Sequence, residues 1–235
     1  MPPRFVHLRL HSEYSVVDSI LTVDGAVAMA AGDAMPALAL TDLSNMFGMV
    51  KFYSAARKKG IKPILGADVW VASDATAEKI ARILLLVQDR AGYHRLCELL
   101  TRAYRNPGQR GKIVLRREWL LELGTEGLIA LSGAQSGDVG QALMNDAWET
   151  ALSLARAWGD LFPGRYYLEI QRNRRPDVEL HLTQTVQLAG AAGLPVVATH
   201  TVQFPSRDDF KAHEAKVCVA QGDGPAGRRR PVHSA

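Results

Sequence analysis

The stretch Val6-His7-Leu8-Arg9-Leu10-His11-Ser12 alternates apolar and polar side chains. In an extended chain, alternate residues share one face, so His7, Arg9 and His11 are expected to project together. Two imidazoles on one strand face are typical of a metal site. Arg9 argues against a metal, because its guanidinium stays protonated and cannot coordinate a cation. We expect Arg9 to form an ion pair with a nearby carboxylate, the candidates being Asp18, Asp42 and Asp68.

Beyond this stretch, strand and helix signals alternate along the chain. Helical patterns run from a Ser44 cap to Lys59 with Gly60 at the C′ position, and over Gly92–Tyr104, Ala147–Leu161 and Pro176 to Gly193. The repetition predicts parallel strands joined by crossover helices, an α/β fold that is either a barrel or a doubly wound sheet. The predicted strands are Phe5–Leu10, Ala37–Thr41, Ile64–Val71, Ile83–Val87, Leu128–Leu131, Tyr166–Ile170 and Val196–Thr199.

Composition indicates a globular chain. Of 235 residues, 47% are hydrophobic and 22% are charged, which suits one large α/β domain or two small ones. No apolar stretch approaches a membrane span, the N-terminus lacks a signal-peptide core, and the two cysteines form no metal-like spacing. We therefore expect a reducing, cytoplasmic location and no membrane partner.

The net charge of +4 is a weak indication of nucleic-acid binding. Arg228, Arg229 and Arg230 lie together near the C-terminus, so part of the excess belongs to the tail. A dedicated duplex-binding domain usually carries a basic stripe, and the body of this chain shows none.

Polar residues cluster where the predicted strands end, which is where β/α barrels place their chemistry. One interpretation is a rim of imidazoles and carboxylates that holds a divalent metal for hydrolysis. The alternative is a set of loop residues that hydrogen-bond to neighbouring turns. The candidate residues are His7, Arg9, His11, Asp18, Asp42, Asp68, Gln135 and His200.

Several segments in order resemble one family. Residues 5–15 and 36–42 resemble the first and second motifs of the PHP (polymerase and histidinol phosphatase) superfamily. Residues 47–53, 60–68, 131–140 and 193–199 resemble the alpha subunit of bacterial DNA polymerase III, of the proteobacterial type. The resemblance covers about residues 3–219, so residues 1–219 are expected to form the PHP domain. The Gly/Pro/Arg-rich residues 220–235 are expected to be disordered or artefactual.

The resemblance implies a distorted, seven-stranded β/α (TIM-like) barrel at the N-terminus of a longer DNA-directed DNA polymerase. Palm, fingers and thumb fall outside this chain, which is therefore expected not to polymerise DNA alone. Active members of the family bind up to three metal ions and hydrolyse phosphoesters. The proteobacterial members resemble scaffolds without metals that dock the proofreading exonuclease, the epsilon subunit.

Compared position by position, the family's metal ligands are largely lost. His11, Asp18 and Asp42 match, and Asp68 stands where the family usually has glutamate. His200 lies one place before an expected ligand. The positions without a ligand are Arg9, Leu43, Gln135, Thr201 and Gln203.

We therefore expect no catalytic residue, no metal and no cofactor, with the remaining polar residues forming a salt-bridged remnant at the rim. The expected partners are the polymerase core of the same chain and the epsilon subunit, with DNA reached only through the full-length replicase. Two alternatives remain open. One is a residual phosphoesterase or 3′–5′ exonuclease that binds Zn, Mn or Mg, and the other is a DNA-binding module.

Other conspicuous side chains are expected to be structural. His94, His181 and His213 lie in predicted helices and are expected at the surface or its boundary. The four tryptophans are expected to be packing residues and not platforms for base stacking.

Overall fold

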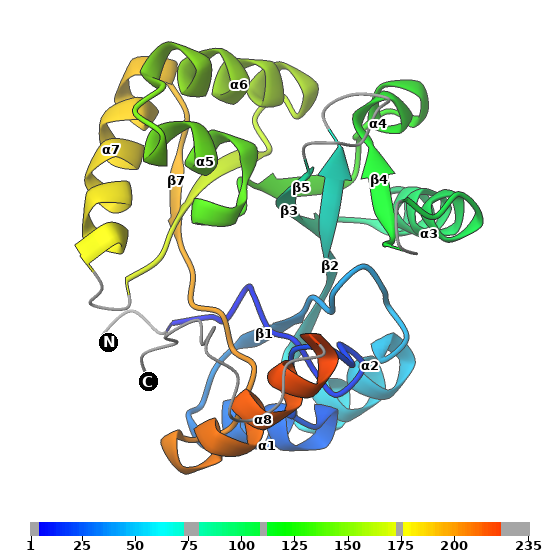
Figure 1. Ribbon diagram of the computed structural model, residues 1–235. Coiled ribbons are helices and arrows are strands. Elements are labelled where there is room, and N and C mark those ends of the chain that lie inside the picture. The colour runs from blue at the N-terminus through cyan, green and yellow to red at the C-terminus, as the bar shows by residue number, and fades with distance from the viewer. Residues whose placement is uncertain (1–4, 73–79, 109–111, 173–175, 222–235) are drawn as a thin grey trace. The chain divides into compact units, whose positions relative to one another are not determined.

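The computed structural model describes residues 5–72, 80–108, 112–172 and 176–221 (Figure 1). The chain forms two compact units. Residues 1–65 and 200–235 make up the first unit, and residues 66–199 make up the second. Among the described helices, none is both long enough and apolar enough to span a membrane.

The first unit has three α-helices and a short parallel strand pair: α1 (Val23–Gly32), α2 (Met49–Lys58), α8 (Phe210–Gln221), β1 (Ala37–Leu40) and the start of β2 (Lys62–Ala72). Thr22 caps α1 by accepting a hydrogen bond from Gly25 N–H. Helix α1 packs on α2, and their apolar faces enclose a core that includes Leu21, Leu38 and Phe52.

Residues 5–10, predicted as the first strand, form an extended segment with only one β-bridge, from Leu10 to Val202. Ala39 N–H donates to the carbonyl of His7 at 2.9 Å, and Val202 N–H donates to that of Arg9 at 3.2 Å. The segment thus bonds to neighbours on both sides, but with too few consecutive pairs to make a regular strand. The strand prediction is wrong in its assignment, while the extended conformation behind it is confirmed.

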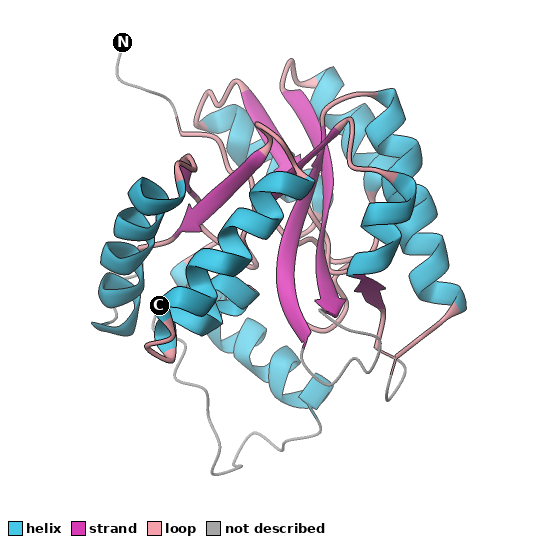
Figure 2. Ribbon diagram, turned by 90° about the horizontal axis from the view of Figure 1, so that it is seen from above, coloured by secondary structure: helices cyan, strands magenta, loops and turns pink. Residues whose placement is uncertain are grey.

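The described residues of the second unit contain the rest of β2, five further strands and five α-helices. Figure 2 distinguishes the helices from the strands across the described chain. The strands are β3 (Ile80–Val87), β4 (Val114–Arg116), β5 (Leu128–Leu131), β6 (Tyr166–Ile170) and β7 (Val196–Ala198). The helices are α3 (Arg90–Arg105), α4 (Arg117–Leu123), α5 (Asp138–Met144), α6 (Trp148–Leu161) and α7 (Pro176–Ala192).

The sheet is mixed, which corrects the prediction of parallel strands throughout. Its order is β1-β2-β3-β5-β6-β7, with β4 pairing β2. Strand β3 runs antiparallel to both β2 and β5, and the other pairs are parallel. Residues 73–79 alone separate β2 from β3, and a parallel crossover needs about a dozen residues or more.

The α/β class and the count of seven strands are confirmed, although β4 takes the place of residues 5–10. Helices α3, α6 and α7 lie where helical spacing predicted them. Ser44 does not cap α2, because it has a left-handed φ of 54° and the cap is Gly48. Helix α8 extends to Gln221, two residues into the predicted tail, and residues 222–235 lie outside the described residues.

Candidate functional site

The first polar cluster belongs to the first unit and joins two predicted site residues. His11 is buried and donates its Nδ1–H to Asp18, with both carboxylate oxygens at 3.1 Å. His213 of α8 donates Nε2–H to the carbonyl oxygen of Asp18 at 2.9 Å. His213 is itself buried, which corrects its expected surface position. The loop that carries Asp18 is thus held by hydrogen bonds to His11, near the N-terminus, and to His213, near the C-terminus.

Asp42 lies two residues after the end of β1 and accepts hydrogen bonds from several donors. Ser12 supplies its backbone N–H at 2.6 Å and its hydroxyl at 2.9 Å, and Ser15 supplies its hydroxyl at 2.7 Å. Ser15 Oγ also accepts from Leu43 N–H at 2.9 Å. Leu43, where the resemblance predicted a histidine ligand, contributes its backbone N–H to the hydrogen-bond network of Asp42 through Ser15.

His7 lines a cavity of about 380 Å³ in the first unit, together with His200, Thr201 and Gln203. His7 Nδ1 is buried and has no hydrogen-bond partner among the described residues. Burial lowers the pKa of His7, the nearby His200 lowers it further, and Asp33 partly opposes the shift. The lowered pKa of His7 favours its neutral imidazole.

Arg9 is buried, with 4% of its surface exposed. The carboxylates proposed as its partners bond to other groups as well: Asp18 to His11, Asp42 to Ser12 and Ser15, and Asp68 to an arginine of β3. The ion pair predicted for Arg9 stays a prediction.

Asp68, in β2 of the second unit, is fully buried and forms an ion pair with Arg82 of the adjacent β3. Arg82 donates Nε–H to one carboxylate oxygen at 3.0 Å and Nη2–H to the other at 2.5 Å. The guanidinium also lies 4.7 Å from the centre of the Trp70 ring, and Lys112 lies 4.5 Å from that ring. The sequence analysis did not identify Arg82. A single arginine within the apolar run of β3 could have indicated a buried cation that needs a carboxylate partner.

Glu169 of β6 is a second buried carboxylate of this unit. One oxygen accepts Gly133 N–H at 3.0 Å, and the other accepts the Thr199 hydroxyl. Burial lowers the pKa of His181 on α7, and Glu169 partly opposes the shift. His181 is buried, contrary to the expectation that it lies at the surface, because its α7 face packs inward and its Nε2 meets the Thr185 hydroxyl at 3.3 Å.

Gln135, near the position of an expected histidine ligand, turns toward α7. Its side chain donates Nε2–H to the carbonyl oxygen of Asp177 at 3.1 Å. The Gln135 side chain therefore links a 3₁₀ turn (Ala134–Ser136) to the start of α7 by a hydrogen bond.

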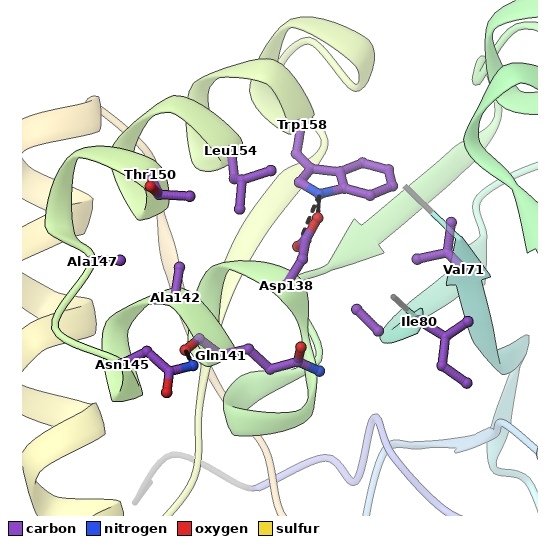
Figure 3. Close-up of a pocket in the computed structure, with 11 residues that line it drawn as sticks. Val71, Ile80, Asp138, Gln141, Ala142, Asn145, Ala147, Thr150, Leu154 and Trp158 are labelled. Carbon is purple, nitrogen blue, oxygen red and sulfur yellow. Dashed lines mark hydrogen bonds between the residues drawn. The ribbon is translucent and has the colours of Figure 1, made fainter. Parts of the chain in front are cut away.

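Another cavity, of about 440 Å³, lies in the second unit between α5, α6 and the facing ends of β2 and β3 (Figure 3). Asp138 and Trp158 meet at its wall, where Trp158 donates its indole N–H to the Asp138 carboxylate at 2.9 Å. Trp158 is almost fully buried, as expected for a packing residue. The rest of the lining is largely apolar or amide, so this cavity offers no acid–base pair for catalysis.

The residues present do not fit a divalent metal. Asp68 already carries a bidentate guanidinium, and Asp42 already accepts three strong donors. Leu43 and Gln203 stand where the resemblance predicted histidine, and Thr201 stands where it predicted aspartate. Within the described parts of the chain, no three His, Cys, Asp or Glu side chains form a group that could hold a metal ion.

Comparison with known proteins gives a consistent result. The model of the PHP domain family matches residues 7–173. DNA polymerase III subunit alpha of Pseudomonas aeruginosa is 44% identical over 231 residues, which are 98% of this chain and 20% of that protein. The subunit of Escherichia coli K12 is 45% identical over 221 residues, 94% of this chain and 19% of that protein. The chain thus spans about a fifth of the length of these relatives.

Solved structures share the fold at low identity. An amidohydrolase from Chromobacterium violaceum aligns with a TM-score of 0.57 at 16% identity, covering 90% of this chain and 96% of that one. A protein of Bifidobacterium adolescentis, assigned as a metal-dependent phosphoesterase, aligns with a TM-score of 0.52 at 11% identity, covering 92% and 98%. These alignments confirm the expected fold.

Proposed function

The chain belongs to the PHP domain family, and on this premise we propose that it is the N-terminal domain of a bacterial replicative DNA polymerase, with a structural and docking role and no hydrolytic activity. The similarity to DNA polymerase III alpha subunits extends over nearly the whole chain. Polymerisation of DNA would then belong to the remaining four fifths of such a protein.

The observation that carries the non-catalytic role is the Asp68–Arg82 pair. The guanidinium of Arg82 hydrogen-bonds to both oxygens of the Asp68 carboxylate, which a metal ion would otherwise coordinate. Its positive charge also repels a cation. Asp42 is engaged in the same way by hydroxyl and backbone donors. The polar residues at the strand ends then stabilise the domain as a hydrogen-bonded remnant, comprising His7, Arg9, His11, Asp18, Asp42, Asp68, Gln135 and His200.

The partners follow from this role. They are the polymerase core of the same polypeptide and the proofreading exonuclease, the epsilon subunit of the replicase. DNA is reached through the full-length enzyme in the cytoplasm, where bacterial replication takes place. Relatives named DNA polymerase III subunit alpha support the polymerase core as a partner.

The test is metal analysis of the purified 235-residue chain, combined with a phosphoesterase assay in added zinc, manganese or magnesium. We expect no stoichiometric metal and no hydrolysis above background. An Asp42→Ala variant serves as the control once circular dichroism has shown that it is folded under the assay conditions. Two or more tightly bound ions per chain, or a metal-dependent activity that Asp42→Ala abolishes, would overturn the proposal and establish a residual phosphoesterase or 3′–5′ exonuclease.

A further inference from the structure

The cavity of about 440 Å³ in the second unit has the size and composition of a small-molecule site (Figure 3). We call it the α5–α6 cavity. Much of its wall is aliphatic, from Val71 and Ile80 at the strand ends to Leu154 on α6. Among the described residues that line it, Asp138 is the one that carries a charge. A single carboxylate in a mainly apolar wall can fix the position of a ligand of opposite charge.

Asp138 is held in place by neutral donors. Trp158 donates its indole N–H to Oδ2 at 2.9 Å, and Val139 donates its backbone N–H to Oδ1 at 2.8 Å. Trp158 is itself fixed, because it is 2% exposed and its ring stacks on that of Tyr166 with 6.2 Å between the ring centres. The carboxylate therefore keeps a defined position in the wall. Its two oxygens can accept about four hydrogen bonds, so acceptor capacity remains for a ligand.

The charge of Asp138 is not neutralised by an ion pair within the described chain. The ion pairs of the described residues involve other carboxylates. The guanidinium of Arg117 lies 4.5 Å from the centre of the Trp158 ring, but Arg117 does not line the cavity. A carboxylate that is partly withdrawn from water is stabilised by a cation in direct contact with it. The α5–α6 cavity thus favours a ligand that carries a positive charge.

The amide side chains of the lining also favour a ligand that donates hydrogen bonds. Gln141 donates its side-chain N–H to the carbonyl oxygen of Ser136 at 3.0 Å, and Asn145 donates to that of Gln141 at 2.8 Å. These bonds engage the amide nitrogens, so the side-chain oxygens add acceptors to the lining. An anion is disfavoured by the charge of Asp138. A metal ion such as Mg²⁺ or Ca²⁺ needs a shell of six or more oxygens, which one carboxylate in an aliphatic wall does not supply.

We propose that the α5–α6 cavity binds a small organic cation of the alkylammonium class, with its charged head on Asp138 and its apolar chain along Val71, Ile80 and Leu154. The ammonium group donates charge-assisted hydrogen bonds to the carboxylate, and the chain buries aliphatic surface. This site shares no residue with the polar remnant at the strand ends, and it is independent of the docking role.

The experiment titrates the purified 235-residue chain with hexylammonium chloride and follows the indole N–H resonance of Trp158 in ¹H–¹⁵N NMR spectra. Neutral 1-hexanol and anionic hexanoate are matched probes with the same number of carbons. We expect hexylammonium to bind with a Kd below about 1 mM and to shift the Trp158 resonance. We expect 1-hexanol to bind at least about tenfold more weakly and hexanoate not to bind, because neither pairs with the carboxylate.

Two variants test the charge and the space. Asp138→Asn removes the charge but keeps the shape, and it should weaken hexylammonium binding by about tenfold or more. Ala142→Leu enlarges a lining side chain and should weaken the binding of hexylammonium and 1-hexanol alike. Glu149→Gln, which removes an exposed carboxylate of α6 outside the lining, is the matched control and should change the Kd by less than about twofold. Circular dichroism and the melting temperature verify that every variant is folded.

Several results would overturn the proposal. Equal affinities for hexylammonium and 1-hexanol would show that the cavity recognises only the apolar chain. Unchanged hexylammonium binding to Asp138→Asn would remove the carboxylate as the anchor. Absence of hexylammonium binding to the wild type, or an equal Trp158 shift with magnesium chloride alone, would exclude an organic-cation site. None of these results affects the metal analysis that tests the structural role.

Discussion

The Arg82→Met substitution removes the cation from the buried Asp68–Arg82 pair while keeping most of the side-chain volume. Asp68 is 0% exposed and Arg82 is 13% exposed, so solvent screens the pair little. Each of the two charge-assisted hydrogen bonds contributes about 1.5–3 kcal/mol. Removing one partner of a buried pair costs about 3–5 kcal/mol, because the remaining charge stays desolvated. We expect the free energy of unfolding to fall by that amount.

The assay is urea denaturation of the purified chain. Far-UV circular dichroism and tryptophan fluorescence both monitor unfolding, and coincident curves would show a single transition. Arg82→Lys keeps the charge but loses the fork of donors, so about 1–2 kcal/mol of destabilisation is expected. Adding Asp68→Asn to Arg82→Met removes the unpaired charge and is expected to recover part of the loss. A loss below about 1 kcal/mol for Arg82→Met, or equal losses for Met and Lys, would refute the reasoning.

Other predictions concern single contacts, each measured by the free energy of unfolding. Gly92→Ala in α3 places a Cβ 1.8 Å from the carbonyl oxygen of Gly127, so it should destabilise by about 1–3 kcal/mol even though alanine favours helices; an unchanged stability would contradict the close packing. Asp42→Ala leaves a buried N–H and two hydroxyls without their acceptor, and a loss of about 3 kcal/mol is expected; a loss under about 1 kcal/mol would show that water replaces the carboxylate. Tyr166→Phe removes a buried hydroxyl whose one indicated side-chain partner among the described residues is Ser132, so stability should change by less than about 1 kcal/mol, and a larger loss would show that this hydroxyl makes a strong hydrogen bond. The pKa of His181 is lowered by burial, so the unfolded chain binds its proton first; stability should decline as pH falls below about 6.5, and His181→Gln should flatten that decline between pH 7 and 5. An identical pH dependence in the variant would exclude His181 as a cause.

The sequence predicted the regular elements well where apolar runs were short and uninterrupted. The predictions for β5 and β6 match residue for residue, because each is an apolar run bounded by turn residues. The reversal of β3 was not predicted, since strand direction depends on the length of the connection and not on periodicity. Residues 5–10 were predicted as a strand because alternating apolar and polar residues are typical of an extended backbone. A regular strand also needs consecutive backbone hydrogen bonds to a neighbouring strand, and these residues have one β-bridge.

The candidate site was only partly predictable. Sequence reasoning found the carboxylates but did not predict Arg82 as the partner of Asp68, because pairing across strands depends on a register that the sequence alone does not reveal. Arg82 stands opposite Trp70 in the β2–β3 ladder, and this register brings its guanidinium to Asp68. The burial of His181 and His213 was missed because each lies on a helix of mixed polarity with a weak amphipathic signal.

The first unit is discontinuous in sequence, with residues 66–199 inserted between its two parts. The Ser19 hydroxyl meets the carbonyl of Gln203 across 184 positions, and His213 meets Asp18 across 195. Closing a flexible loop of this length costs about 4–5 kcal/mol of chain entropy. If residues 66–199 fold first, most of the loop is already rigid, and the entropy cost of closing it is smaller. The second unit should consequently acquire protection from hydrogen exchange early in refolding, and the amides of Leu10–Leu21 should gain it last. During synthesis on the ribosome, the N-terminal residues emerge first yet complete their packing only after residue 213 has been made.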